Sequence, residues 1–295
     1  RGVESGDSMS IAEPRHASVL CANPAGLHRI GYVEWGDPGN PRVLLCVHGL
    51  TRTGRDFDTL ARVLSADFRV VCPDMAGRGR SQWLPDPSRY AVPQYLADCI
   101  TLIARLQVDT IDWIGTSMGG LVGMALAALP GNPVRKLVLN DVGPEIDAQG
   151  LARIARYVGT GGPFVTRDEG LALLRALSPG FGPHDEAQWA SLNAHQLVQR
   201  ADGGWALHYD PAIAKPLAGL DGTPLPTMWP LWSAITCPTL AMRGAESDLL
   251  SQATLARMAA EGPRARTVEV SGVGHAPTLM VSEQMQPIRD FLAAR

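Results

Sequence analysis

Two features that identify whole classes of protein are missing from this sequence. No apolar run approaches the roughly 20 residues that span a bilayer, and no charged start precedes the apolar stretch of a secretory signal. With 26 basic and 29 acidic residues the net charge is −3, so the chain lacks the excess charge that attracts nucleic acid or an anionic membrane. We therefore expect a cytoplasmic monomer or homodimer that binds a small-molecule substrate and neither nucleic acid nor a membrane.

Cysteine is also scarce, and its spacing excludes the usual metal-binding patterns. The five cysteines are an odd number without paired spacing, and three lie in or beside apolar runs. We interpret them as buried, reduced thiols, and we expect no metal and no other cofactor. They are Cys21, Cys46, Cys72, Cys99 and Cys237.

The remaining composition is that of a globular protein, because 295 residues with 45% hydrophobic content can bury a full core. Apolar strands alternate with helices, which indicates an α/β fold with a mostly parallel sheet covered on both faces. No run between about Gly143 and Trp232 resembles a central strand. We expect a flexible N-terminal extension at residues 1–17, an α/β core at 18–142 and 233–295, and a helical cap insertion at 143–232.

The apolar runs and turn residues predict the individual elements. Expected strands cover residues 27–35, 43–47, 68–72, 110–114, 136–141, 238–243 and 266–270. Expected helices cover residues 56–64, 92–106, 120–129, 151–157, 168–177, 186–199, 253–260 and 282–294. The turn from Gly36 to Pro41 suggests a hairpin that leads into the buried strand 43–47.

The sequence is organised around the pentapeptide Gly115-Thr116-Ser117-Met118-Gly119, which reads as strand, sharp turn and helix. Such a turn places Ser117 above the sheet edge, where a nucleophile is needed. A serine hydroxyl is weak unaided, so the interpretation requires a histidine base, a carboxylate that orients it and two N–H donors for an oxyanion. On its own the pentapeptide is equally typical of an ordinary turn.

Residues that follow other strands supply the missing groups, because ligands bind beyond the carboxyl ends of parallel strands. The Leu50 N–H follows the strand 43–47, and the Met118 N–H at the helix start is its expected partner in an oxyanion hole. Asp248 follows the strand 238–243, and His275 follows the strand 266–270 in a glycine-flanked loop. The predicted catalytic residues are therefore Ser117, Asp248 and His275.

Other residues compete for these roles. Asp141 also follows a strand and is the alternative to Asp248 as the acid. His48 is a weaker alternative to His275, since it directly precedes the residues expected to bind the oxyanion. We assign His48, Trp229 and Trp232 to substrate binding, although packing between cap and core is the simpler interpretation of the two tryptophans. The loop from Met75 to Ser81 lacks the Walker pattern, so we interpret it as a loop near the pocket and not as a phosphate cradle.

The combination of motifs resembles the α/β-hydrolase superfamily from about Leu27 to the C-terminus. The resemblance is carried by His-Gly after an early strand, G-T-S-M-G at the elbow, R-G-x-x-S-D after a late strand and G-x-G-H-A-P before the last helix. It implies a Ser-His-Asp triad, an oxyanion hole and a helical cap that roofs the pocket. It also implies an acyl-enzyme formed on Ser117 and hydrolysed by water that His275 activates.

Hydrolysis of a small carboxylic ester needs the fewest special residues beyond the triad, and we expect this activity. An aspartate nucleophile, as in epoxide hydrolases and haloalkane dehalogenases, is excluded by Ser117. Carbon–carbon bond hydrolases of aromatic degradation are weakened as an alternative by Thr116 and Ala276, where those enzymes tend to have asparagine and tryptophan. Enol-lactonases and cofactor-free haloperoxidases stay open, as does a non-catalytic, ligand-binding member of the fold. A scaffolding protein would leave the coincidence of the post-strand residues unexplained.

Overall fold

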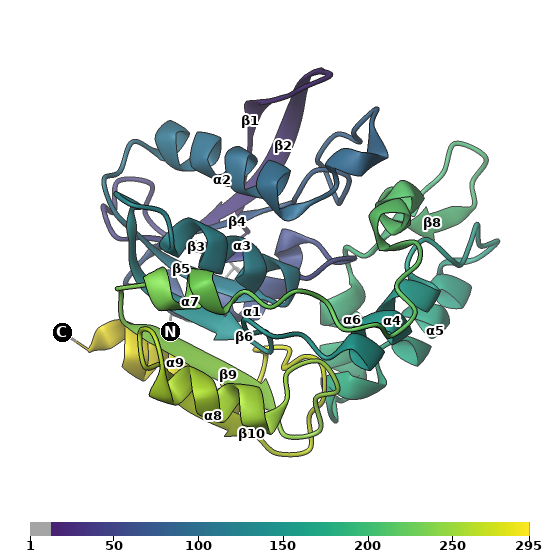
Figure 1. Ribbon diagram of the computed structural model, residues 1–295. Helices are drawn as coiled ribbons and strands as arrows, with labels where there is room; N and C mark the ends of the chain where they lie inside the picture. The colour runs from purple at the N-terminus through teal and green to yellow at the C-terminus, as the bar shows by residue number, and fades with distance from the viewer. Residues whose placement is uncertain (1–12, 295) are drawn as a thin grey trace, which may run out of the picture.

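The computed structural model describes residues 13–294, and its centre is an eight-stranded sheet with helices on both faces (Figure 1). In spatial order the strands are β1 (Arg15–Asn23), β2 (Gly26–Trp35), β4 (Arg69–Pro73), β3 (Val43–Val47), β5 (Ile111–Thr116), β6 (Val134–Asn140), β9 (Thr239–Gly244) and β10 (Arg266–Val270). β2 runs antiparallel to both β1 and β4, and all other neighbours are parallel. The predicted mostly parallel α/β sheet is confirmed.

Two apolar cores cover the two faces of this sheet, and the alternation of side chains along a strand explains why. Along β3, Val43 and Val47 belong to one core and Leu44 and Cys46 to the other. The first core is closed by α2 (Val92–Leu106), α3 (Met118–Ala127), α7 (Trp229–Ala234) and α8 (Gln252–Ala260). The second is closed by the 3-10 helix η1 (Gly54–Phe57), α1 (Asp58–Leu64) and α9 (Ser282–Ala293).

A separate group of elements between β6 and α7 lies beyond one end of the sheet (Figure 1). It contains α4 (Ala148–Tyr157), α5 (Arg167–Ala176), the 3-10 helix η3 (Pro179–Phe181), α6 (Glu186–Asn193), β7 (Leu197–Gln199), β8 (Trp205–Leu207) and the 3-10 helix η4 (Pro211–Leu217). We call this group the cap. A short 3-10 helix in the core, η2 (Pro87–Arg89), contacts η4. The cap therefore stands over the edge from which the candidate loops leave.

Three sequence predictions are corrected by the structure. The hairpin is formed by β1 with β2, whereas β2 next pairs with β4 and not with β3. Strand β1 already begins at Arg15, so the last residues of the predicted extension belong to the sheet, and residues 1–12 lie outside the described part of the chain. The helix predicted at 186–199 ends at Asn193, because residues 197–199 pair with β8 across an Asp-Gly-Gly turn.

The structure also bears on membrane spans and on the thiols. No helix within residues 13–294 combines the length and the apolar character that crossing a membrane requires. All five cysteines are free, four of them buried and Cys237 half-buried.

Candidate active site

Ser117 lies in the sharp turn between β5 and α3, with φ of 51° and ψ of −116°. A positive φ costs a residue with a side chain about 1–3 kcal/mol, and such strain is typical of functional sites. Two glycines allow the turn, since a Cβ on Gly115 would collide with the Gly119 carbonyl and a Cβ on Gly119 with that of Val47. The turn presents Ser117 to a cavity of about 770 Å³ between core and cap.

His275 lies in the loop after β10, lines the same cavity and pairs with Asp141, which directly follows β6. Its Nδ1 is 2.7 Å from Asp141 Oδ2. Asp141 is fully buried, and its other oxygen, Oδ1, accepts a 2.8 Å bond from the Gly244 N–H. Because a carboxylate accepts this bond, the proton lies on His275 Nδ1 and leaves Nε2 free as a base.

A third donor to Asp141 comes from Ser247, which the sequence interpretation passed over. Its hydroxyl lies 2.6 Å from Asp141 Oδ2, while Ser247 Oγ itself faces the N–H groups of Leu249 and Leu250 at 3.2 Å. Since those two groups are donors, the serine proton is left for Asp141. The R-G-x-x-S-D motif therefore contacts the acid Asp141 through its serine, Ser247, and not through its aspartate. The serine of the motif was the feature of the sequence that could have indicated this contact.

Asp248 is the main correction to the predicted site. Its carboxylate pairs with Arg153 of α4, where Nη2 is 2.9 Å from Oδ1 and Nε bonds to Oδ2. The Arg153 guanidinium lowers the pKa of Asp248 despite partial burial of the carboxyl. The side chain is 46% exposed, whereas that of Asp141 is inaccessible. The structure therefore places the alternative residue, Asp141, against His275, and it turns Asp248 toward the cap.

The two N–H groups predicted to form an oxyanion hole both belong to residues that line the cavity, Leu50 and Met118. Within residues 13–294, neither N–H donates a hydrogen bond to a protein group. The Leu50 loop is held by Arg78, a fully buried residue whose Nε donates a 2.8 Å bond to the Leu50 carbonyl. Arg78 comes from the Gly-Arg-Gly-Arg loop, which accordingly supports the pocket with its arginine.

The three predicted substrate-binding residues do not line this cavity. His48 is fully buried, with Nδ1 donating to the Gly49 carbonyl at 2.7 Å and Nε2 accepting the Met75 N–H at 2.9 Å. Burial lowers the pKa of His48 to about 3, so the ring is neutral and structural.

Trp229 and Trp232 belong to α7, which packs on the core helix α3 and not in the cap. Their Nε1 atoms donate to Glu145 Oε2 at 3.1 Å and to the Glu261 carbonyl at 2.9 Å. Both indole rings are buried, and neither they nor His48 line the cavity, so the structure gives no support to their assignment to substrate binding. Side chains of both the core and the cap line the cavity, and the cap contributes apolar residues such as Leu151, Leu174 and Leu217.

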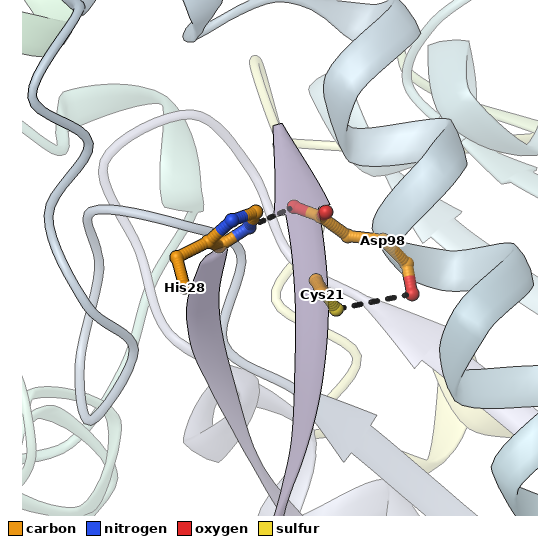
Figure 2. A group of neighbouring side chains, drawn as sticks. All are labelled: Cys21, His28 and Asp98. Carbon is orange, nitrogen blue, oxygen red and sulfur yellow. Dashed lines mark hydrogen bonds and ion pairs between the residues drawn. The ribbon is translucent and has the colours of Figure 1, made fainter. Parts of the chain in front are cut away.

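A second cluster of titratable side chains lies outside the cavity lining, between the β1–β2 hairpin and α2 (Figure 2). Cys21, His28 and Asp98 are all buried, and their potential ligand atoms lie within 4.8 Å of one another. His28 Nε2 is 3.0 Å from Asp98 Oδ2, and the Cys21 thiol faces the Asp98 carbonyl at 3.9 Å. Burial, with Asp98 nearby, raises the pKa of Cys21 to about 12, so the sulfur stays protonated.

Hydrogen bonds to neighbouring groups determine which ring nitrogen of His28 carries the proton. The Ala25 N–H donates to Asn23 Oδ1 at 2.8 Å, which orients the Asn23 amide so that Nδ2 donates to His28 Nδ1 at 3.0 Å. His28 Nε2 therefore carries the proton and donates it to Asp98. A metal at this nitrogen would displace that proton, so we assign the cluster to holding the hairpin on α2.

Comparisons with known proteins agree with this architecture. A model described as the alpha/beta hydrolase family matches residues 44–292. A 3-hydroxybutyrate-oligomer hydrolase from Cupriavidus necator is 54% identical over 281 residues, covering 93% of this chain and 96% of that protein. An esterase from Escherichia coli is 29% identical over 245 residues, covering 80% and 87%. A solved alpha/beta hydrolase from Novosphingobium aromaticivorans is 40% identical with a TM-score of 0.85, covering 96% of this chain and 99% of that one.

Proposed function

The chain belongs to the α/β-hydrolase family and is a hydrolase of that type. We propose that it cleaves the carboxylic ester bonds in short oligomers of a hydroxy acid such as 3-hydroxybutyrate. The observation that carries the chemistry is the His275–Asp141 pair on the wall of the cavity that Ser117 also lines. The substrate class comes from the relative that is 54% identical, whose printed name specifies 3-hydroxybutyrate oligomers.

The proposed reaction begins with attack of Ser117 Oγ on the ester carbonyl carbon, while His275 Nε2 takes the hydroxyl proton. Asp141 holds the imidazole through Nδ1 and stabilises the cation that forms. The carbonyl oxygen becomes an oxyanion near the N–H groups of Leu50 and Met118, and loss of one such donor commonly costs about 3 kcal/mol of transition-state stabilisation.

Collapse of this intermediate breaks the bond between the carbonyl carbon and the alcohol oxygen, which leaves with the proton from His275. Water then attacks the acyl group on Ser117, with its proton passing to His275, and a second collapse releases the acid and restores the serine hydroxyl. The cavity of about 770 Å³ has the size of a site for a small molecule of several carbons.

The test is incubation of the purified protein with the dimer and trimer of 3-hydroxybutyrate, with the released monomer measured by chromatography. We expect rapid release that is lost in Ser117→Ala, as well as labelling of Ser117 by a fluorophosphonate. Labelling without release from either oligomer would overturn the substrate class and direct the search to lactones and ring-fission products. Absence of both would indicate a ligand-binding member of the fold.

A further inference from the structure

Most side chains around the cavity are apolar, so the few charged ones stand out. A charge in an apolar wall is costly unless it is paired, and an incompletely paired one is a candidate to bind a charged ligand. Apart from His275, the charged residues of the lining are Arg52, Asp56, Arg153, Glu246 and Asp248.

Arg52 has four of its five guanidinium N–H groups bonded to protein acceptors. Its Nε and Nη2 donate to Asp56, Nη1 donates to Asn193 Oδ1 at 3.0 Å, and Nη2 also donates to the Leu192 carbonyl at 2.8 Å. Its side chain is 10% exposed, and Asp56 is also bonded to Gln196. This arginine ties the core to α6 of the cap, so it is structural.

Arg153 is paired on one edge only. Nε and Nη2 donate to the two oxygens of Asp248, and Tyr157 is the only other described side chain that lies close enough to bond to the guanidinium. The side chain is 38% exposed, nearly four times the exposed fraction of Arg52. A guanidinium has five N–H groups in a fixed plane, so its outer edge, formed by Nη1 and Nη2, can donate to a second carboxylate while Nε and Nη2 stay bonded to Asp248.

Tyr157 adds a neutral donor beside that edge. It follows Arg153 by four residues on α4, which places the two side chains on the same helix face, and both line the cavity. Asp248 raises the pKa of Arg153 most strongly, and the nearby Tyr157 adds to the rise. Burial raises the pKa of Tyr157, so its hydroxyl stays protonated and available as a donor.

We propose that the outer edge of Arg153, with the Tyr157 hydroxyl, binds the free carboxylate at the end of the oligoester, and that Asp248 positions the guanidinium. The proposal rests on the proposed function for the identity of the substrate. It accounts for Asp248 in a pocket where that residue is not paired with His275. Glu246, an exposed residue of the same loop as Asp248, also lines the cavity, and its negative charge disfavours binding of an anion beside it.

The experiment measures binding without turnover, in the Ser117→Ala protein, by calorimetry. The ligands are the 3-hydroxybutyrate dimer, which ends in a carboxylate, and its methyl ester, in which that group is neutral and carries one more methyl. We expect the dimer to bind more tightly than the ester. Adding Arg153→Gln should weaken dimer binding about 10- to 100-fold, the usual effect of losing a charged hydrogen bond, and change ester binding less than threefold.

Two variants serve as controls. Arg153→Lys keeps the charge but loses the planar fork, so it should restore part of the affinity for the dimer. Arg156→Gln removes an exposed arginine of the same helix that does not line the cavity, and it should leave both affinities unchanged. If Arg153→Gln fails to fold, Arg153→Lys and Tyr157→Phe provide the same comparison.

Equal binding of dimer and ester to the Ser117→Ala protein, or binding of neither, would overturn the proposal. So would an Arg153→Gln variant that weakens both ligands equally, which would mark the Arg153–Asp248 pair as a link between cap and core only. Turnover of the dimer by the unmodified enzyme is measured separately. Selective binding without hydrolysis would sustain the carboxylate site and refute the proposed function.

Discussion

The molecule contains two hydrogen-bonded pairs of histidine and aspartate, one whose histidine lines the cavity and one that is buried away from its lining. His275 and Asp141 meet at 2.7 Å on a cavity wall, and His28 and Asp98 meet at 3.0 Å beneath the hairpin. The second ring nitrogen of His28 is bonded to Asn23, whereas Nε2 of His275 has no bonded partner among the described residues. A histidine–aspartate pair is suited to catalysis only where one nitrogen stays free beside a nucleophile.

The largest effect should come from the pair beside the cavity. Ser117→Ala and His275→Ala should each lower kcat by roughly 10⁴- to 10⁶-fold, and the double variant should lose no more, because the two side chains act as one unit. The melting temperature of each single variant, followed by circular dichroism, serves as the control for folding. Independent, multiplying losses would argue against a shared proton transfer.

The choice of acid is the next test of the comparison. Asp141→Asn should lower kcat about 10³- to 10⁴-fold, because an amide no longer accepts the Nδ1 proton and stabilises the wrong tautomer. The matched variant Asp248→Asn should change kcat for an uncharged p-nitrophenyl ester less than threefold. The reverse ranking would restore Asp248 as the acid.

Breaking the buried pair, His28 and Asp98, should lower stability, whereas breaking the pair on the cavity wall should lower turnover. His28→Ala leaves Asp98 buried without its main donor, so the free energy of unfolding should fall by about 2–4 kcal/mol in urea. The fraction that stays folded should hydrolyse a p-nitrophenyl ester within threefold of the unmodified rate. If His28→Ala lowered kcat as much as His275→Ala does, the buried pair would have a role in the reaction, and this prediction would be wrong.

A third histidine, His48, should make the stability of the protein depend on pH. His48 is neutral in the folded protein because burial lowers its pKa to about 3. The unfolded chain takes up a proton near pH 6.5, so it binds more protons than the folded state between these values, and stability falls as the pH falls.

Between pH 7 and pH 5 this difference amounts to about 2 kcal/mol of unfolding free energy. His48→Gln should abolish that part of the pH dependence, as measured by urea unfolding at both values. Asp74 and Asp98, whose pKa values are raised by burial, act in the opposite direction and are common to both proteins. Identical slopes in the two proteins would show that His48 is not the group responsible.

The smallest effect is expected for Trp229, which the sequence analysis assigned to the pocket. Trp229→Phe removes one bond to Glu145 but no group from the cavity, so stability should fall by about 1 kcal/mol. The preferred chain length in a p-nitrophenyl ester series from acetate to decanoate should stay the same. A shifted preference would bring α7 back into the substrate site.

Local patterns predicted the elements best where one pattern dominated. The helix at 92–106 and the strand at 266–270 match α2 and β10 to the residue. The pattern from 186 to 199 misled because the apolar residues near its end belong to β7, whose partner β8 lies across an Asp-Gly-Gly turn. That turn was visible in the sequence, but three-residue strands are too short for periodicity to indicate them.

The sequence by itself determined the α/β family, the elbow that carries Ser117 and the loop that carries His275, because glycine spacing and apolar runs act locally. It favoured Asp248 over Asp141 as the acid, although each follows a strand and no local pattern shows which carboxylate faces His275. Only the tertiary structure brought Gly244, Ser247 and His275 around Asp141 and placed Arg153 against Asp248. The physical reason is that a carboxylate takes its role from the donors that surround it, and those donors come from distant parts of the chain.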